Sequence, residues 1–158
     1  MPKVILICGR ICCGKTTYSK KLCAERNAVL LSADEIMLFL FDQCCGEMHM
    51  EYERRIKNYL FRKSLELIEK GNDVILDWGF WTREERDWVK EFYKSRGIDC
   101  ELYYIPIDDE TWELHVNKRN AAVLKKEAEA YYINLDRAQE FAAMFEEPAQ
   151  EEIDVIIN

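Results

Sequence analysis

The 158-residue sequence predicts a single α/β domain with a parallel β-sheet covered by helices on both faces. Three observations support this fold class. Short apolar runs alternate repeatedly with longer segments of helical pattern. The first apolar run passes through a glycine-bracketed turn into a helical segment. No internal repeat, low-complexity tract or linker divides the chain, and its length suits one domain over residues 1–158.

The first part of the chain predicts two strands and two helices. Val4–Cys8 is a continuous apolar run, which is typical of a strand covered on both faces. Lys15–Arg26 follows with residues that favour a helix, and Ala28–Leu31 reads as a second short strand. Residues 32–35, Ser-Ala-Asp-Glu, form a capping box that opens a helix toward Phe41.

The middle of the chain continues the alternation. In Glu47–Lys70 the apolar residues recur at helical spacing, and Gly71 suits the end of that helix. Asp73–Asp77, "DVILD", reads as a buried strand that ends in a carboxylate. A second capping box at Thr82–Glu85 opens a helix that runs toward Gly97.

The last part predicts two more strands and two more helices. Cys100–Ile105 is the fourth strand, and a helix follows from Asp108 through Arg119. Residues 120–133 are polar and less patterned. We expect a helix capped by Asn134 that ends near Phe145, and a final strand over Ile153–Ile157.

Composition and charge exclude several classes of protein. The chain is 49% hydrophobic and 33% charged, a globular balance rather than that of a disordered or membrane protein. It has no apolar run near the roughly 20 residues that span a bilayer and no signal-peptide pattern, so we expect a cytoplasmic protein. The odd number of cysteines, 7, and the lack of C-x-x-C spacing favour free thiols over zinc ligands or disulfides. The net charge of −8 argues against a polyanionic partner.

Residues 9–16, "GRICCGKT", match the phosphate-binding pattern G-x-x-x-x-G-K-[ST] at every defined position. Glycines let backbone N–H groups approach phosphate oxygens, and the following helix turns its positive end toward them. Lys15 would reach the terminal phosphates, and the hydroxyl of Thr16 would bind Mg²⁺. The residues expected to hold the nucleotide are Gly9, Arg10, Ile11, Cys12, Cys13, Gly14, Lys15, Thr16 and Thr17.

Cys13 allows two interpretations. It precedes the helix N-terminus beside Lys15, an environment that lowers the pKa of a thiol and would make it reactive. The other interpretation, which the sequence favours, is a small residue that fills space in the loop. Full nucleotide affinity after alkylation of Cys13 would contradict the first interpretation.

Two carboxylates are candidates for chemistry. Asp34 follows the second strand, so in a parallel sheet it emerges at the same edge as the phosphate loop, where it could take a proton from an acceptor hydroxyl. The alternative is a first-turn Asp that is favoured only by the helix dipole. Asp77 ends an apolar strand, the position at which a carboxylate holds Mg²⁺ directly or through water.

The loop after Asp77 is aromatic, and a cationic pair lies farther along the chain. Aromatic side chains in such a loop can stack on an acceptor or pack beneath the next helix. The candidate acceptor-binding residues there are Trp78, Phe80, Trp81 and Arg83. Lys118 and Arg119 end a predicted helix just before the polar excursion, where a mobile lid would bring a cation to the transferring phosphoryl group. The alternative for the pair is a basic helix end that offsets the dipole.

The order of these motifs resembles that of small AAA-type P-loop kinases. The resemblance rests on the phosphate loop, the Asp34-Glu35 turn, "DWGFWTREERD" from Asp77, and "RNA" from Arg119, and it runs from Val4 to about Glu152. Relatives in this group include chloramphenicol phosphotransferase, zeta toxins and the polynucleotide 5′-kinase domain. The resemblance implies a kinase-type sheet of five parallel strands, ATP as phosphoryl donor and a lid at about residues 119–133.

The resemblance also implies roles for individual residues. Lys15 and Thr16 match the residues for ATP and Mg²⁺, Asp34 matches the base for the acceptor hydroxyl, and Arg119 matches the lid arginine. Asp77 matches a strand-end Asp whose role varies among relatives. The chain departs from its relatives at residues 125–126, where it has two lysines instead of arginines or prolines, so a second lid cation is not assigned.

We therefore expect an ATP-dependent kinase that phosphorylates a hydroxyl of a small molecule. The sequence indicates neither the identity of that molecule nor the oligomeric state of the protein. A polynucleotide 5′-hydroxyl kinase is one alternative; acidity disfavours it, and the basic residues of the long helix favour it. Those residues are Arg54, Arg55, Lys57, Arg62 and Lys63. A non-catalytic ATP-binding regulatory module is another alternative. The presence of both Asp34 and Arg119 disfavours it, since binding alone needs neither.

Overall fold

Five parallel strands form one sheet in the order β2-β3-β1-β4-β5. The structure is a computed structural model and describes residues 1–158. The strands are β1 (Lys3–Cys8), β2 (Val29–Leu31), β3 (Val74–Gly79), β4 (Asp99–Tyr104) and β5 (Val155–Ile156). The helices are α1 (Lys15–Arg26), α2 (Ala33–Phe41), α3 (His49–Glu69), α4 (Arg83–Lys94), α5 (Asp109–Leu124) and α6 (Leu135–Ala143). Two short 3₁₀ turns lie at Gly46–Met48 and Gln150–Glu152. The predicted fold class is confirmed, and no helix is both long and apolar enough to cross a membrane.

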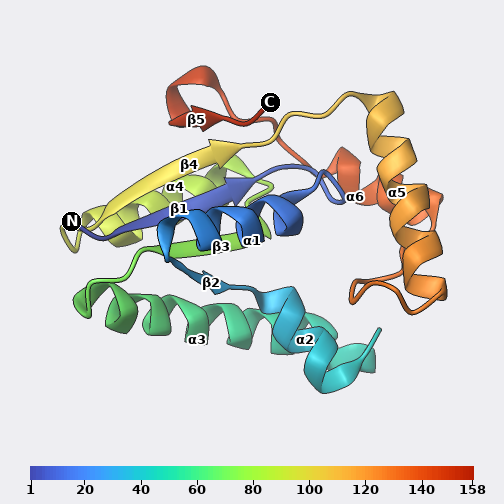
Figure 1. Cartoon of the computed structure of the whole chain (residues 1–158), viewed down its shortest axis with the longest axis horizontal. Helices are drawn as coiled ribbons and strands as arrows, with labels where there is room; N and C mark the ends of the chain where they lie inside the picture. Colours follow the sequence, from blue (N-terminus) through green and yellow to red (C-terminus); the bar gives the residue numbers. More distant parts are fainter.

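The core lies on both faces of the sheet because successive residues of the central strand β1 point to opposite faces. Val4 and Leu6 pack in the cluster that α3 and α4 cover, whereas Ile5 and Ile7 pack in the cluster that includes Leu22 of α1. All four β1 residues have no exposed surface. In Figure 1, α1 lies in front of the strands, α4 behind them and α3 below them.

Several element boundaries differ by one or more residues from those expected. Helix α5 continues past Arg119 to Leu124, because the Ala-Ala-Val-Leu run that ends there favours a helix. Strand β3 extends to Gly79, which pairs with Cys8 across an irregularity in the register, so Asp77 lies within the strand rather than at its end. Strand β5 has only two residues, which pair with the end of β4.

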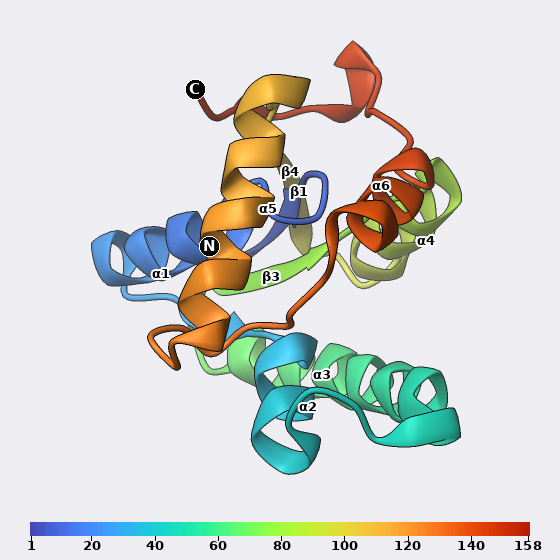
Figure 2. The same ribbon diagram turned by 90° about the vertical axis from the view of Figure 1, so that its right-hand side faces the viewer.

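Parallel strands place their carboxyl ends at one edge of the sheet, and four connections meet there. The turn between β1 and α1, which we call the P-loop (residues 9–14), lies beside the connections after β2, β3 and β4. Helix α5 stands in front of this edge in Figure 2. The α5–α6 connection (residues 125–134) follows it, and it contains the irregular part of the expected lid.

Candidate active site

The P-loop has the backbone that an anion-binding turn requires. Gly14, the N-cap of α1, has φ 100° and no side chain that caps the helix, so the first N–H groups of α1 remain available to an anion. A Cβ at Gly9 would collide with the sulfur of Cys13 and come within 3.2 Å of the carbonyl oxygen of Ile105. Gly9 therefore allows the loop to close against β4, and Gly14 allows it to turn into α1.

The ammonium group of Lys15 lies over this turn. Its Nζ donates to the carbonyl oxygens of Gly9 at 3.1 Å and Arg10 at 2.7 Å, and it lies 3.7 Å from the sulfur of Cys13. These contacts hold the positive charge at the concave side of the loop, where the motif requires it.

Helix α5 fixes the outer side of the P-loop. Arg10 of the loop forms an ion pair with Asp109 at 2.8 Å and donates to the carbonyl oxygen of Ile107 at 2.6 Å. The indole N–H of Trp112 donates to the carbonyl oxygen of Ile11 at 2.7 Å. These contacts could not be predicted from the sequence, because nothing in the local pattern of α5 marks Trp112 as a partner of a loop about 100 residues earlier.

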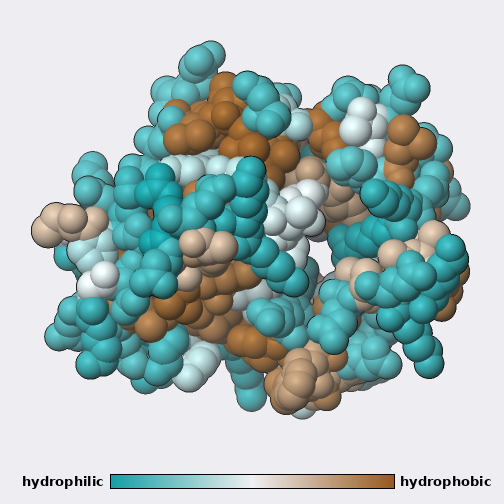
Figure 3. All heavy atoms as spheres, viewed as in Figure 1, coloured by the Kyte–Doolittle hydropathy of each residue, from teal (hydrophilic) through white to brown (hydrophobic).

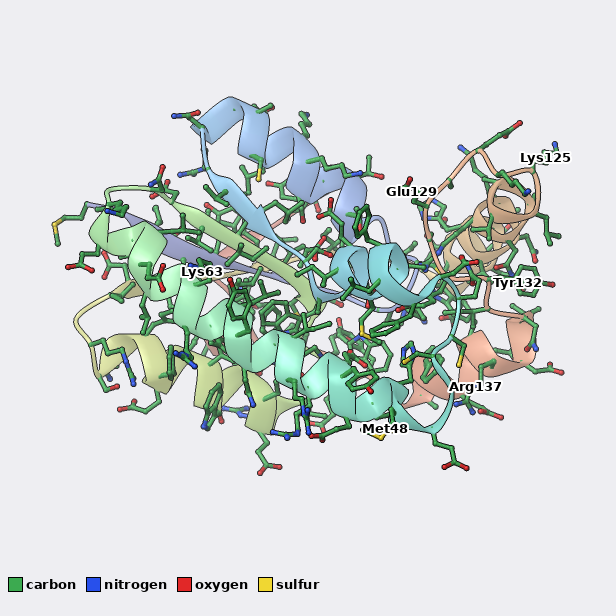
Figure 4. The ribbon with its side chains drawn as sticks, turned by 90° about the horizontal axis from the view of Figure 1, so that it is seen from below. Met48, Lys63, Lys125, Glu129, Tyr132 and Arg137 are labelled. Carbon is green, nitrogen blue, oxygen red and sulfur yellow. The ribbon has the colours of Figure 1, made fainter.

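Arg119 reaches the P-loop from the same helix, one turn after His115. Its Nη1 donates to the sulfur of Cys12 at 3.2 Å, and its buried Nε has no partner. Cys12 has φ 60°, which turns its side chain toward α5. The structure therefore brings the predicted lid arginine and the phosphate loop together. Lys125, in contrast, lies at the outer end of α5 in Figure 4.

Cys13 is buried at 5% exposure, and Cys12 is the more accessible of the two loop thiols. Burial raises the pKa of Cys12, and the charges of Arg119 and Lys15 oppose that change. All seven cysteines are free thiols. The proposed reactivity of Cys13 therefore faces a steric obstacle, and it stays a prediction.

Asp77 is buried beside the P-loop with an unsatisfied oxygen. Its side chain is 6% exposed, and its Oδ2 has no hydrogen-bond partner. Burial raises its pKa to about 6; the hydroxyls of Ser32 and Thr16 and the charge of Lys15 oppose this shift, and Asp34 adds to it. An orphaned carboxylate oxygen close to the Thr16 hydroxyl fits a divalent cation, which commonly takes one or two carboxylates plus substrate phosphates.

Asp34 lies in the first turn of α2, where the Ser32 hydroxyl accepts from the backbone N–H of Glu35 at 3.2 Å. Asp34 is exposed at the surface, but partial desolvation by the surrounding protein raises the pKa of its carboxyl group. Glu53 of α3 raises this pKa further, whereas Lys57, Arg119 and Lys15 lower it. Two of these three cations, Arg119 and Lys15, also contact the P-loop.

Helix α3 and the start of α4 supply the other charges near Asp34. Lys57 pairs with Glu53 at 3.0 Å and lies 6.0 Å from the ring of Trp78. Burial raises the pKa of Glu85, Lys57 opposes that change, and Glu53 adds to it. The sequence marked Lys57 only as a basic residue of the long helix and Glu85 only as part of a capping box, and it did not mark Glu53. The helical spacing of Glu53 and Lys57 signals only a surface ion pair.

The aromatic loop behaves differently from what the sequence suggested. Phe80 is fully buried in the core and is therefore removed from any acceptor surface. Trp81 lies against Gly79 and near Phe141 of α6, and its indole nitrogen has no partner. Arg83 points to the C-terminal segment, where it meets Glu151 at 3.3 Å. Of the four candidate residues, Trp78 is the one that belongs to β3, and its ring lies 6.0 Å from the ammonium group of Lys57.

In Figure 3 the surface is hollowed between the main body and the region of α5. A cavity of about 710 Å³ lies beside the P-loop, the first turn of α5 and the end of α6, and Lys15 and Asp34 do not line it. Its polar lining includes Arg10, Tyr104, Asp108, Thr111, His115 and Glu147.

The sequence profile of an AAA domain family, AAA_33, matches residues 4–152. The chain belongs to this family. No curated protein matches the sequence significantly.

Solved structures of P-loop proteins share the fold of this AAA domain. One is Chaetomium thermophilum Kti12 in complex with ADP-AlF3, with a TM-score of 0.72 and 17% identity over 98% of this chain and 88% of that one. Another is a gluconokinase from Sinorhizobium meliloti 1021, with a TM-score of 0.64 and 12% identity over 99% and 82% of the two chains. A chain of the Pnkp1/Rnl/Hen1 RNA repair complex has a TM-score of 0.72 and 19% identity, covering 90% of this chain and 43% of that one.

These likenesses confirm the kinase-type P-loop fold that the motif order implied. Membership of the AAA domain family supports nucleotide-dependent phosphoryl transfer as the general class of activity. The residues of this AAA domain fit a nucleotide with Mg²⁺, since uncapped N–H groups, Lys15 and the orphaned oxygen of Asp77 meet at one place.

Proposed function

We propose that the protein is an ATP-dependent kinase that transfers the γ-phosphoryl group to a hydroxyl of a small molecule. The observation that carries this proposal is that Arg119 reaches the P-loop, where Lys15 lies, and that the charges of both cations lower the pKa of Asp34 at the start of α2. Binding a nucleotide needs the P-loop, but it does not need a carboxylate placed among the cations that would stabilise a transferring phosphoryl group.

Each residue then has a role that its position allows. Asp34 takes the proton of the acceptor hydroxyl, and its raised pKa makes it a better base at neutral pH than an ordinary aspartate. Lys15 and Arg119 stabilise the negative charge that spreads over the phosphoryl oxygens. Thr16 and Asp77 would hold Mg²⁺, which supplies further charge neutralisation when bound.

The charges near Asp34 favour an acceptor without negative charge. Glu53, Glu85 and Lys57 lie near Asp34, in the region where we propose that the acceptor binds. Lys57 is the only cation of the three, and it is already paired with Glu53. An anionic acceptor would meet an excess of carboxylates there, whereas an alcohol that is neutral or carries an amine would not.

A test is phosphoryl transfer to an unfractionated metabolite extract with Mg²⁺–ATP, followed by mass spectrometry for species that gain one phosphoryl group. The matched variants are Asp34→Asn and Glu35→Gln, which remove neighbouring carboxylates from one helix turn. We expect a product with the native protein and with Glu35→Gln, and a loss of at least 100-fold, on the order of a general base's contribution, with Asp34→Asn. Transfer that persists in Asp34→Asn would overturn the role of Asp34.

A polynucleotide 5′-hydroxyl kinase is the second candidate, and the likeness to a chain of an RNA repair complex is the observation that favours it. The basic residues of α3 give it little support, because Arg54 and Arg55 both pair with Glu51, and Lys63 pairs with Glu66. Binding of a 5′-hydroxyl oligonucleotide that weakens steeply with salt would favour this candidate. ATP binding with no acceptor of either kind would favour a regulatory module.

A further inference from the structure

The α5–α6 connection is joined to the turn between α2 and α3 by one side chain. The amide nitrogen of Gln43 donates to the carbonyl oxygen of Ala130 at 2.9 Å, and its amide oxygen accepts from the backbone N–H of Tyr132 at 2.8 Å. Both hydrogen-bonding ends of one amide are thus used on two backbone groups that flank Tyr131. We call this arrangement the Gln43 clasp.

The clasp places Tyr131 on the acceptor side of Asp34. Its ring makes an edge contact with His49 of α3, with ring centres 5.7 Å apart. Burial raises the pKa of its hydroxyl, and the charges of Asp34 and Glu53 and the thiols of Cys45 and Cys44 raise it further. The hydroxyl is buried and has no hydrogen-bond partner, which is costly for a tyrosine unless a ligand supplies one.

Tyr132, the next residue, lies differently. Its side chain is 47% exposed, and Figure 4 places it on the outer side of the α5–α6 connection. Two adjacent tyrosines therefore differ in environment: one points into the site, and the other points to solvent.

We infer that Tyr131 is an acceptor-binding residue whose hydroxyl hydrogen-bonds the acceptor beside Asp34, and that Gln43 is the positioning residue that holds Tyr131 there. This inference rests on the proposed function. The partner that satisfies the Tyr131 hydroxyl is an oxygen or nitrogen of a polar acceptor, which the bond orients so that its reacting hydroxyl faces Asp34. The part of the connection that the Gln43 clasp holds thus acts in acceptor selection as well as in closing the site.

The first experiment measures acceptor kinetics. A panel of a neutral sugar, a cyclic polyol, an aminoglycoside and a nucleoside identifies an alcohol that the native protein phosphorylates, and KM and kcat are then measured for it. We expect Tyr131→Phe to raise the acceptor KM about five- to tenfold, the typical effect of one lost hydrogen bond, with an unchanged KM for ATP. Tyr132→Phe, the matched control, changes neither. Equal acceptor KM in native protein and Tyr131→Phe overturns the inference.

The second experiment does not require an acceptor. Hydrogen exchange of the backbone N–H of Tyr132 is compared in native protein, Gln43→Ala and Gln43→Glu, since the latter retains only the accepting end. We expect faster exchange in Gln43→Ala and near-native protection in Gln43→Glu. Unchanged exchange in Gln43→Ala overturns the Gln43 clasp. If no compound of the panel is phosphorylated while fluorescent ATP still binds, the proposed function fails, and the exchange result alone decides the clasp.

Discussion

At the scale of single residues, Asp77 shows how a binding site is kept at the expense of stability. A buried carboxylate with one unpaired oxygen is unfavourable in the folded chain, and its pKa of about 6 measures that cost. In the unfolded chain the pKa would be near 3.9, so between about pH 4 and pH 6 folding takes up a proton. Stability therefore falls as the pH rises through this range and is lowest, with respect to this group, above pH 6.

Asp77→Asn removes that charge and keeps a side chain that can bond to Ser32 and Thr16. We expect the free energy of unfolding at pH 7.5 to rise by about 2 kcal/mol, with little change at pH 4. Urea unfolding at the two pH values measures this difference. Asp99→Asn, at an exposed position, is the control and has no such effect. Equal pH dependence in Asp77→Asn and native protein would show that Asp77 titrates normally. We also expect Asp77→Asn to lose Mg²⁺-dependent affinity for the nucleotide.

At the scale of elements, capping and periodicity predicted which segments form helices, because those signals are local. Ser32 and Thr82 cap α2 and α4 as expected, with their hydroxyls accepting from the backbone N–H groups of Glu35 and Glu85, but the return bonds from the two Glu side chains that would complete a capping box do not form. The contacts that join elements were not predictable. Arg86 of α4 is 1% exposed and its Nε meets Glu152 at 2.8 Å across 66 residues of sequence. Neither residue carries a local pattern that announces a buried ion pair.

This ion pair joins α4 to the segment that leads into β5. Arg86 also donates to the carbonyl oxygens of Phe80 at 3.1 Å and Glu146 at 2.9 Å, so three connections depend on one guanidinium group. We expect Glu152→Gln to lower the free energy of unfolding by about 3 kcal/mol, because it leaves a buried charge without its counter-ion. Glu151→Gln, at a residue with 66% side-chain exposure, lowers it by less than about 0.5 kcal/mol. If denaturant unfolding showed that Glu152→Gln and Glu151→Gln lower the free energy of unfolding by the same amount, the structural role of the Arg86–Glu152 pair would be contradicted.

At the scale of the whole molecule, the sequence predicted the site more fully on the nucleotide side than on the acceptor side. The P-loop is one contiguous stretch whose chemistry depends on fixed spacing, so a motif describes it. The proposed acceptor side draws on α2, α3, α4 and the α5–α6 connection, and its members lack fixed spacing. Asp34 could be named as a candidate because the edge rule for parallel sheets places it beside the P-loop. Tyr131 and Gln43 depend on the approach of two loops, which no periodicity records.

The position of the P-loop at the end of the central strand β1 predicts that nucleotide binding stabilises the whole domain. With Mg²⁺–ATP at 100 times its Kd, we expect about 2.7 kcal/mol of added stability, or a rise in Tm of roughly 5–10 °C for a chain of this size. Lys15→Met should lose this rise. Asp34→Asn should keep it, because Asp34 is assigned to the acceptor and touches no nucleotide phosphate. Thermal unfolding across an ATP titration separates the two variants. If Asp34→Asn lost the rise as Lys15→Met does, Asp34 would belong to the nucleotide site, and the proton of the acceptor would need another base.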